Sequence, residues 1–321
     1  MKPVAHPERS ASSLVRSLLL AFTLASTWLC SAAVGAVEQS TAVARKIIPV
    51  GIAPTAVIFD GVSVWCVNQG SDNVTKILAS DGTVQGTFNV GNVPLGAAFD
   101  GLNIWITNWA DDTVSELRAS DGALLGTFPA GDQPTEIVSD GANVWVTNQS
   151  INRVTKIRVS DGTILGSFGV GDFPLGITFD GANIWAANYD SNTVTKLRAS
   201  DGTLLGTFPL AGHAYEAFWD GTYVWVVIHT PDMVVKLRPS DGTVVGSFPT
   251  GAAPQGIAFV GNKLWVTNAF DNNISVLAAS DGRLFREIAV KKYPAGILFD
   301  GMSVWTCCLE SNILIQKRIS R

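Results

Sequence analysis

Hydrophobic and polar positions along the chain follow one pattern that repeats every 40 residues. A tryptophan marks the same point of each repeat. The seven are Trp65, Trp105, Trp145, Trp185, Trp225, Trp265 and Trp305. A period this strict arises from a repeated structural unit. Six full units run from Val50 to Ala289, and a seventh stops at Arg321.

Within a unit, short apolar runs alternate with turn signals. The unit 170–209 contains the runs GITFD, NIWAAN, TVTKLRA and TLLGTF, with Asp180-Gly181 and Asp201-Gly202 between runs. Asp-Gly supplies the positive φ values that tight hairpins need. Four short antiparallel strands per unit, with no helical periodicity after residue 40, predict the blades of an all-β propeller.

The two ends of the chain predict how the ring closes. The seventh unit lacks its outermost strand, and residues 43–49 align with the strand ALLGTFP that ends the second unit. The N-terminal strand is therefore expected to complete the last blade, which removes exposed strand edges. We predict one seven-bladed domain over residues 37–321. Its units start at residues 50, 90, 130, 170, 210, 250 and 290.

Two repeated residue types have structural interpretations. The tryptophans are expected to pack between neighbouring blades rather than to stack on a ligand. Asp or Asn recurs in the loop after the second strand, where it favours a turn rather than a metal site. These residues are Asp72, Asp112, Asn152, Asn192, Asp232, Asn272 and Asn312.

The N-terminal segment has the features of an export signal. Lys2, Arg9 and Arg16 precede the uncharged stretch Ser17–Val37, and residues 34–36 fit a cleavage site. The stretch is also long enough to remain as a membrane anchor. We favour a cleaved signal peptide over residues 1–36, which predicts a periplasmic or extracellular protein without stable membrane insertion.

The charge of the chain argues against one class of partner. The formal net charge is −5, and residues 1–36 contribute three basic residues and one acidic residue, so the remainder carries −7. Nucleic-acid binding needs a basic surface. We therefore expect no nucleic acid among the partners.

Three cysteines follow residue 36, namely Cys66, Cys307 and Cys308. All three lie on second strands of the first and last units, which become neighbours when the ring closes. Strand alternation places Cys66 and Cys307 on facing surfaces. A disulfide between them, a vicinal disulfide between Cys307 and Cys308, and free thiols are the three alternatives.

The motifs Trp-Val-Thr-Asn (145–148 and 265–268), P-x-G-I-x-F-D-G and V-G-x-x-P resemble those of YVTN β-propeller repeat proteins, with Trp in place of the Tyr. The resemblance covers residues 43–321 and implies a seven-bladed propeller. It implies no catalytic residues, because that family has no single activity.

The segment G-I-x-F-D-G-x-N-I-W is also similar to the repeats of streptogramin lyases, which are seven-bladed and metal-dependent. For this chain, the similarity to those lyases would imply a histidine that acts as a base and a Glu-x-His sequence element. This chain has no Glu-x-His, and after residue 36 its only histidines are His213 and His229. The resemblance therefore carries over no lyase site.

Candidate ligand contacts are expected where the blades differ from one another. The fifth unit differs most, and its motif LAGHAYE replaces the usual proline. The candidates lie near the loops after second strands and the entries to innermost strands. They are Trp109, Glu136, Tyr189, His213, Tyr215, Glu216 and His229. Two histidines and two glutamates are suitable ligands for a divalent metal or suitable acid–base groups.

These residues support more than one function. The first hypothesis is an exported non-enzymatic propeller, without a cofactor, that binds a protein, a glycan or a small molecule on one face. The alternative is a metal-dependent lyase or hydrolase at the centre of the ring. A role beside quinone-cofactor enzymes is a third hypothesis, although no repeat pattern for holding a quinone is present.

Overall fold

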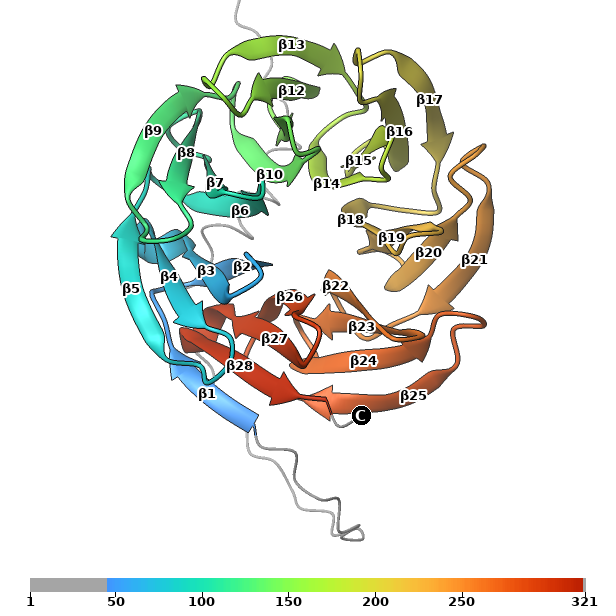
Figure 1. Cartoon of the computed structure of the whole chain (residues 1–321). Helices are drawn as coiled ribbons and strands as arrows, with labels where there is room; N and C mark the ends of the chain where they lie inside the picture. Colours follow the sequence, from blue (N-terminus) through green and yellow to red (C-terminus); the bar gives the residue numbers. More distant parts are fainter. Residues whose placement is uncertain (1–44, 320–321) are drawn as a thin grey trace, which may run out of the picture. The chain divides into compact units, whose positions relative to one another are not determined.

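A computed structural model describes residues 45–319, and the predicted signal peptide lies outside this range. The described residues form seven four-stranded antiparallel sheets that follow one another around a ring (Figure 1). This arrangement confirms the predicted seven-bladed all-β propeller. No helix within residues 45–319 is both long enough and apolar enough to cross a membrane.

Each blade contributes one strand to each of four concentric positions. The innermost strands are β2 (Pro54–Phe59), β6 (Pro94–Phe99), β10 (Pro134–Ser139), β14 (Pro174–Phe179), β18 (Ala214–Trp219), β22 (Pro254–Val260) and β26 (Pro294–Phe299). The second strands are β3 (Ser63–Asn68), β7 (Asn103–Asn108), β11 (Asn143–Asn148), β15 (Asn183–Asn188), β19 (Val224–Ile228), β23 (Lys263–Asn268) and β27 (Ser303–Cys308).

The outer half of each blade repeats in the same way. The third strands are β4 (Asn73–Leu78), β8 (Thr113–Arg118), β12 (Arg153–Arg158), β16 (Thr193–Arg198), β20 (Met233–Leu237), β24 (Asn273–Ala278) and β28 (Ile313–Arg318). The outermost strands are β5 (Val84–Asn89), β9 (Leu124–Pro129), β13 (Ile164–Gly169), β17 (Leu204–Pro209), β21 (Val244–Pro249), β25 (Leu284–Ala289) and β1 (Arg45–Pro49). Short 3₁₀ turns, η1 (Gln69–Ser71) and η2 (Leu309–Ser311), follow β3 and β27.

The first strand closes the ring as predicted. β1 pairs antiparallel with β28, from Arg45 opposite Lys317 to Pro49 opposite Ile313. The seventh blade is therefore built from both ends of the described chain. Its contacts with the first blade include a hydrogen bond of 3.0 Å from Gln316 Nε2 to the Ala79 carbonyl.

The seven repeated tryptophans are fully buried or nearly so, which confirms their packing role. Burying one such ring removes roughly 150–250 Å² from water, worth about 4–6 kcal/mol at about 25 cal/mol per Å². In six blades the indole Nε1 donates to the Asp five residues earlier, at 2.6–2.8 Å. In these six blades the Asp-Gly turn between the first and second strands thus also holds the tryptophan, which the sequence pattern alone did not reveal. In blade 6, Val260 replaces the Asp, and Trp265 Nε1 is buried without a partner in the described structure.

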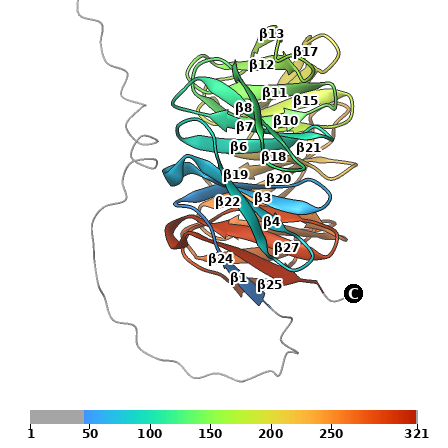
Figure 2. The ribbon, with the colours of Figure 1, turned by 60° about the vertical axis from the view of Figure 1, so that its left-hand side comes forward.

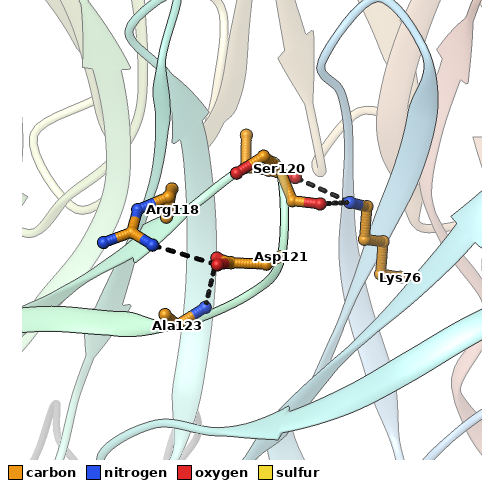
Figure 3. Close-up of polar contacts among 6 residues, drawn as sticks. Lys76, Arg118, Ser120, Asp121 and Ala123 are labelled. Atoms are coloured by element: carbon orange, nitrogen blue, oxygen red, sulfur yellow. Dashed lines mark hydrogen bonds and ion pairs between the residues drawn. The ribbon is translucent and has the colours of Figure 1, made fainter.

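A lysine on the third strand joins each of four blades to the next. Lys76 Nζ donates to the carbonyls of Ala119 and Ser120, at 2.7 and 2.9 Å, in the turn between β8 and β9 (Figure 3). Lys156, Lys196 and Lys236 make the equivalent bonds. We call this bond the lysine latch.

A phenylalanine on each outermost strand of blades 1–5 packs against a glycine of the next blade. Phe88 lies so close to Gly122 that a Cβ at that glycine would sit 2.2 Å from the ring. Gly122 also has a φ of +78°, which favours glycine in this turn. Blade 6 has Ile288 at this position and Val276 at the latch position.

The repeated Asp and Asn residues form turns, as predicted, and they also bind the next blade. Six of the seven have left-handed φ values between 52° and 59°. The side chain of Asp72 accepts the backbone N–H of Val93 at 2.9 Å, and five other blades make the same bond. The connection into blade 5 is the exception.

Candidate functional site

The ring has two faces with different loops (Figure 2). We call one the entry face; it carries the loops after the second strands, such as 69–72, and the connections into each innermost strand, such as 90–93. The other, the turn face, carries the tight turns 60–62 and 79–83 and their equivalents. The candidate residues lie at or near the entry face.

The entry into blade 5 departs from the other six. Each of those has a left-handed residue, φ between 51° and 56°, directly before the proline that begins the innermost strand. In blade 5 the residues are His213 and Ala214, and His213 has no positive φ. The side-chain oxygen of Asn192, which would accept the missing N–H, is buried without a partner among the described residues. The local change costs blade 5 one inter-blade hydrogen bond.

Four rings gather where this bond is lost. Tyr189, after β15, stacks on His213 with ring centres 4.6 Å apart, and His213 Nδ1 lies 3.0 Å from the Tyr189 carbonyl. His229, after β19, meets Tyr189 edge-on at 5.7 Å and stacks on Tyr215 of β18 at 4.1 Å. We call these four residues the His–Tyr cluster. Sequence reasoning placed them on one face, and the structure adds their direct contact.

His229 is held on its other side by blade 6. Its Nε2 lies 3.3 Å from Gln255 Nε2 of β22. Burial lowers the pKa of His229 to about 4, with a further lowering from His213 and an opposing hydrogen bond to the Pro254 carbonyl. The imidazole is therefore neutral near pH 7. Gln255 was not among the predicted residues, because a single glutamine in a repeat gives no distinctive signal.

The two glutamates of the pattern lie on innermost strands of blades 3 and 5. Both stand where the strand pairing is irregular, after Pro134 in β10 and after Ala214 in β18. The backbone N–H of Ala217 donates to the Glu216 carboxylate at 2.9 Å. A glycine in the preceding blade makes room for each, since a Cβ at Gly176 would lie 2.5 Å from the Glu216 Cα.

The two glutamates influence one another electrostatically. Burial raises the pKa of Glu136 to about 7. Burial, followed by the negative charge of Glu136, raises the pKa of Glu216 well above its usual range. Burial also raises the pKa of Tyr215, with contributions from Tyr293 and then Glu216 and Glu136. The glutamates and the His–Tyr cluster therefore form one electrostatic neighbourhood.

Trp109 is the candidate that the structure does not join to this group. It follows β7 in blade 2, and no ring contact connects it with the His–Tyr cluster in the described residues. Phe173, which precedes β14, extends the cluster instead, with its ring 6.3 Å from Tyr189.

The predicted metal ligands do not converge in the described structure. Within residues 45–319, no group of three or more His, Cys, Asp or Glu side chains is placed to hold a metal ion. His213 and His229 each direct one ring nitrogen toward a protein group.

The cysteines lie at the contact between blades 7 and 1. Cys66, Cys307 and Cys308 are buried, and no disulfide joins them in the described structure. Burial raises the pKa of the Cys66 thiol, and its hydrogen bond with Cys307 raises it further. Cys66 therefore faces Cys307, while the disulfide between them stays a prediction.

Comparison with known proteins gives the fold and no family. No protein-family model matches the chain, and no curated protein matches it. Among solved structures, the hydrazine synthase of Kuenenia stuttgartiensis aligns with a TM-score of 0.76 and 17% identity, over 89% of this chain and 99% of the other. A streptogramin B lyase aligns with a TM-score of 0.74 and 19% identity, over 86% and 98%.

The Cps50 (Swd1) β-propeller domain of Myceliophteria thermophila aligns equally well, with a TM-score of 0.74 and 11% identity over 86% of this chain and 100% of the other. What these proteins share with the chain is the propeller fold. One fold carries many functions, so the function must be argued from the site.

Proposed function

We propose that the protein is an exported, non-enzymatic propeller that binds a neutral ligand with a flat face, such as a sugar ring, at the His–Tyr cluster. The stack of Tyr189 on His213 and of Tyr215 on His229 supports this proposal. All four rings are partly exposed, and they hold one another in place. Fixed aromatic rings give contact area at low entropic cost, and aromatic residues are enriched in recognition surfaces.

The charge state of the site determines the class of ligand. His229 is neutral near pH 7, and the raised pKa values of Glu136 and Glu216 favour their protonated forms. A protonated carboxyl group both donates and accepts hydrogen bonds. A hydroxyl-rich neutral ligand satisfies such groups. The predicted export signal and the acidic net charge agree with a glycan or small-molecule ligand outside the cytoplasm.

The test is a thermal melt of the purified chain with maltotriose, cellotriose and chitotriose, each compared with a charged oligogalacturonate. We expect at least one neutral sugar to raise the melting temperature, because a ligand at 100 times its Kd adds about 2.7 kcal/mol. Tyr189→Ala should weaken that binding about tenfold or more. Phe285→Ala, which removes an exposed ring from the outermost strand β25, is the matched control and should bind normally.

Two results would contradict the proposal. One is a melting temperature that no neutral sugar changes. The other is equal binding by the wild type and the Tyr189→Ala variant.

A second candidate function rests on the glutamate pair. Two electrostatically coupled carboxyl groups with raised pKa values are the arrangement expected of an acid–base pair. In that case one of the two carboxyl groups acts as the acid and the other as the base of a lyase or hydrolase. Melts with EDTA or divalent ions test the metal-dependent form. If divalent ions change the melting temperature of the wild type but not that of the double variant Glu136→Gln with Glu216→Gln, the metal-dependent enzyme would be favoured over simple ligand binding.

A further inference from the structure

Three cations meet at the outer junction of blades 6 and 7. Arg45 of β1 stands directly opposite Lys317 of β28 in the antiparallel register. Both side chains line a small cavity of about 10 Å³, together with Trp265. The guanidinium of Arg286, in β25, lies 5.7 Å from the Trp265 ring centre. Like charges directly opposite one another on a sheet are destabilising.

The repeat shows that the fold does not require these cations. Lys317 stands where the other six blades carry an apolar residue, namely Ile77, Leu117, Ile157, Leu197, Leu237 and Leu277. Arg286 stands where blades 1–5 carry a glycine, namely Gly86, Gly126, Gly166, Gly206 and Gly246. The junction has therefore gained two cations beside Arg45 at positions that are elsewhere uncharged.

No carboxylate compensates this charge in the described structure. The ion pairs within residues 45–319 join an Arg to an Asp in blades 2–5, and none involves Arg45, Arg286 or Lys317. Glu287 is the one carboxylate of β25, and strand alternation points it to the opposite face from Arg286. Burial lowers the pKa of Lys317, and the charges of Arg45 and Arg286 lower it further.

The neighbouring Trp265 carries a buried hydrogen-bond donor without a partner within residues 45–319. Trp265 is almost fully buried, and its Nε1 makes no hydrogen bond within residues 45–319 because Val260 replaces the usual Asp. Arg45 and Arg286 are exposed and Lys317 is half-buried, so an anion from solvent can approach all three cations.

We propose that Arg45, Arg286 and Lys317 form a binding site for an oxyanion, meaning a phosphate, sulfate or carboxylate group, at the junction of blades 6 and 7. Guanidinium groups bind such anions through paired N–H donors. Because these side chains are exposed or half-buried, the anion binds at the surface among the three cations, beside the small and mainly apolar cavity. The bound anion joins blade 6 to the closing strand β1 and to β28.

The test compares inorganic phosphate, sulfate and acetate with chloride at equal ionic strength. We expect at least one oxyanion to raise the melting temperature of the purified chain by roughly 3–8 °C at saturation, and ³¹P line broadening to show phosphate binding directly. Lys317→Leu restores the residue of the repeat and should abolish the rise. It should also raise the melting temperature in dilute chloride, because it removes a like-charge contact.

Lys291→Gln is the matched control, since Lys291 is an exposed cation of the connection between the same two blades. The Lys291→Gln variant should show the same rise in melting temperature with the oxyanion as the wild type. Phosphate, sulfate and acetate effects no larger than that of chloride would overturn the proposal. So would an oxyanion effect of equal size in Lys317→Leu. If Lys317→Leu fails to fold, ³¹P line broadening is compared between the wild type and Arg286→Gly. Weaker phosphate binding by Arg286→Gly would support the proposal, and equal binding would overturn it.

Discussion

The entry face of blade 5 and the junction of blades 6 and 7 both break the repeat, but for different reasons. At the junction, Val276 and Ile288 replace a latch lysine and a packing phenylalanine. Elsewhere both of those residues contact the turn between the third and fourth strands of the next blade. Blade 7 has no such turn, since its third and fourth strands come from opposite ends of the chain. The closure of the ring explains these two changes.

Ring closure does not explain the change in blade 5, which also affects the loop after β19, where Asp232 has no positive φ and the Thr230 carbonyl packs against Gly212. Its strands pair like those of the other blades, and its latch residue Lys236 is present. The loss of the left-handed residue and proline leaves Asn192 with an unpaired buried oxygen and brings His213 onto Tyr189. The departure costs one hydrogen bond and brings the rings of the His–Tyr cluster into contact. The two exceptions therefore differ in cause, since ring closure accounts for Val276 and Ile288 but not for the change in blade 5.

The largest expected effect comes from removing the closing strand. Deleting residues 37–49 exposes the edge of β28 and removes the buried Ile48 from the contact with blade 1. We expect a loss of more than about 4 kcal/mol of unfolding free energy, or no folded protein. Urea unfolding followed by tryptophan fluorescence measures it. A deletion variant as stable as the wild type would show that the ring does not depend on β1.

A pair of substitutions tests the missing-turn explanation. Val276→Lys places an ammonium group where blade 7 offers no turn carbonyls, and it should destabilise the protein by about 2–4 kcal/mol. Glu116→Lys is the matched change in blade 2, where the next blade has the receiving turn. Burial and Asp100 already raise the pKa of Glu116, so this change should be neutral or stabilising. Equal destabilisation by both, measured in urea, would contradict the explanation.

The smallest effect concerns pH and the two glutamates. A carboxyl group whose pKa is raised by folding keeps its proton longer in the folded state, so its contribution to stability falls as pH rises from about 4.5 to 7. His229, with its pKa lowered to about 4, has the opposite slope between pH 4 and 6.5. Of these three groups, only the two glutamates still change the free energy of unfolding with pH above pH 6.5.

The double variant Glu136→Gln with Glu216→Gln should therefore gain stability relative to the wild type as pH rises from 5 to 8. Melting temperatures across this range measure the difference. Glu287→Gln, a change at an exposed carboxylate of β25, is the control. Parallel curves for the wild type and the double variant would show that the glutamates are not desolvated.

The sequence predicted the fold well because the repeat carries the same information seven times. The spacing of Trp65 and its equivalents, the Asp-Gly turns and the incomplete last unit together predicted the blade, the number of blades and the closure by residues 43–49, of which 45–49 form β1. The site was less predictable. Which candidate residues touch depends on side-chain rotation at the axis, so the pattern grouped Trp109 with Tyr189 and omitted Gln255.

The closing strand also sets an order of events during folding. The N–H of Ala53 bonds to Asn312, 259 residues further along the chain, and β1 acquires its partner only when the last blade has been made. Contacts between such distant residues form slowly. Until then β1 is an unpaired edge that other chains can bind. A chain of this topology therefore needs β1 kept apart from neighbouring molecules until β28 has formed.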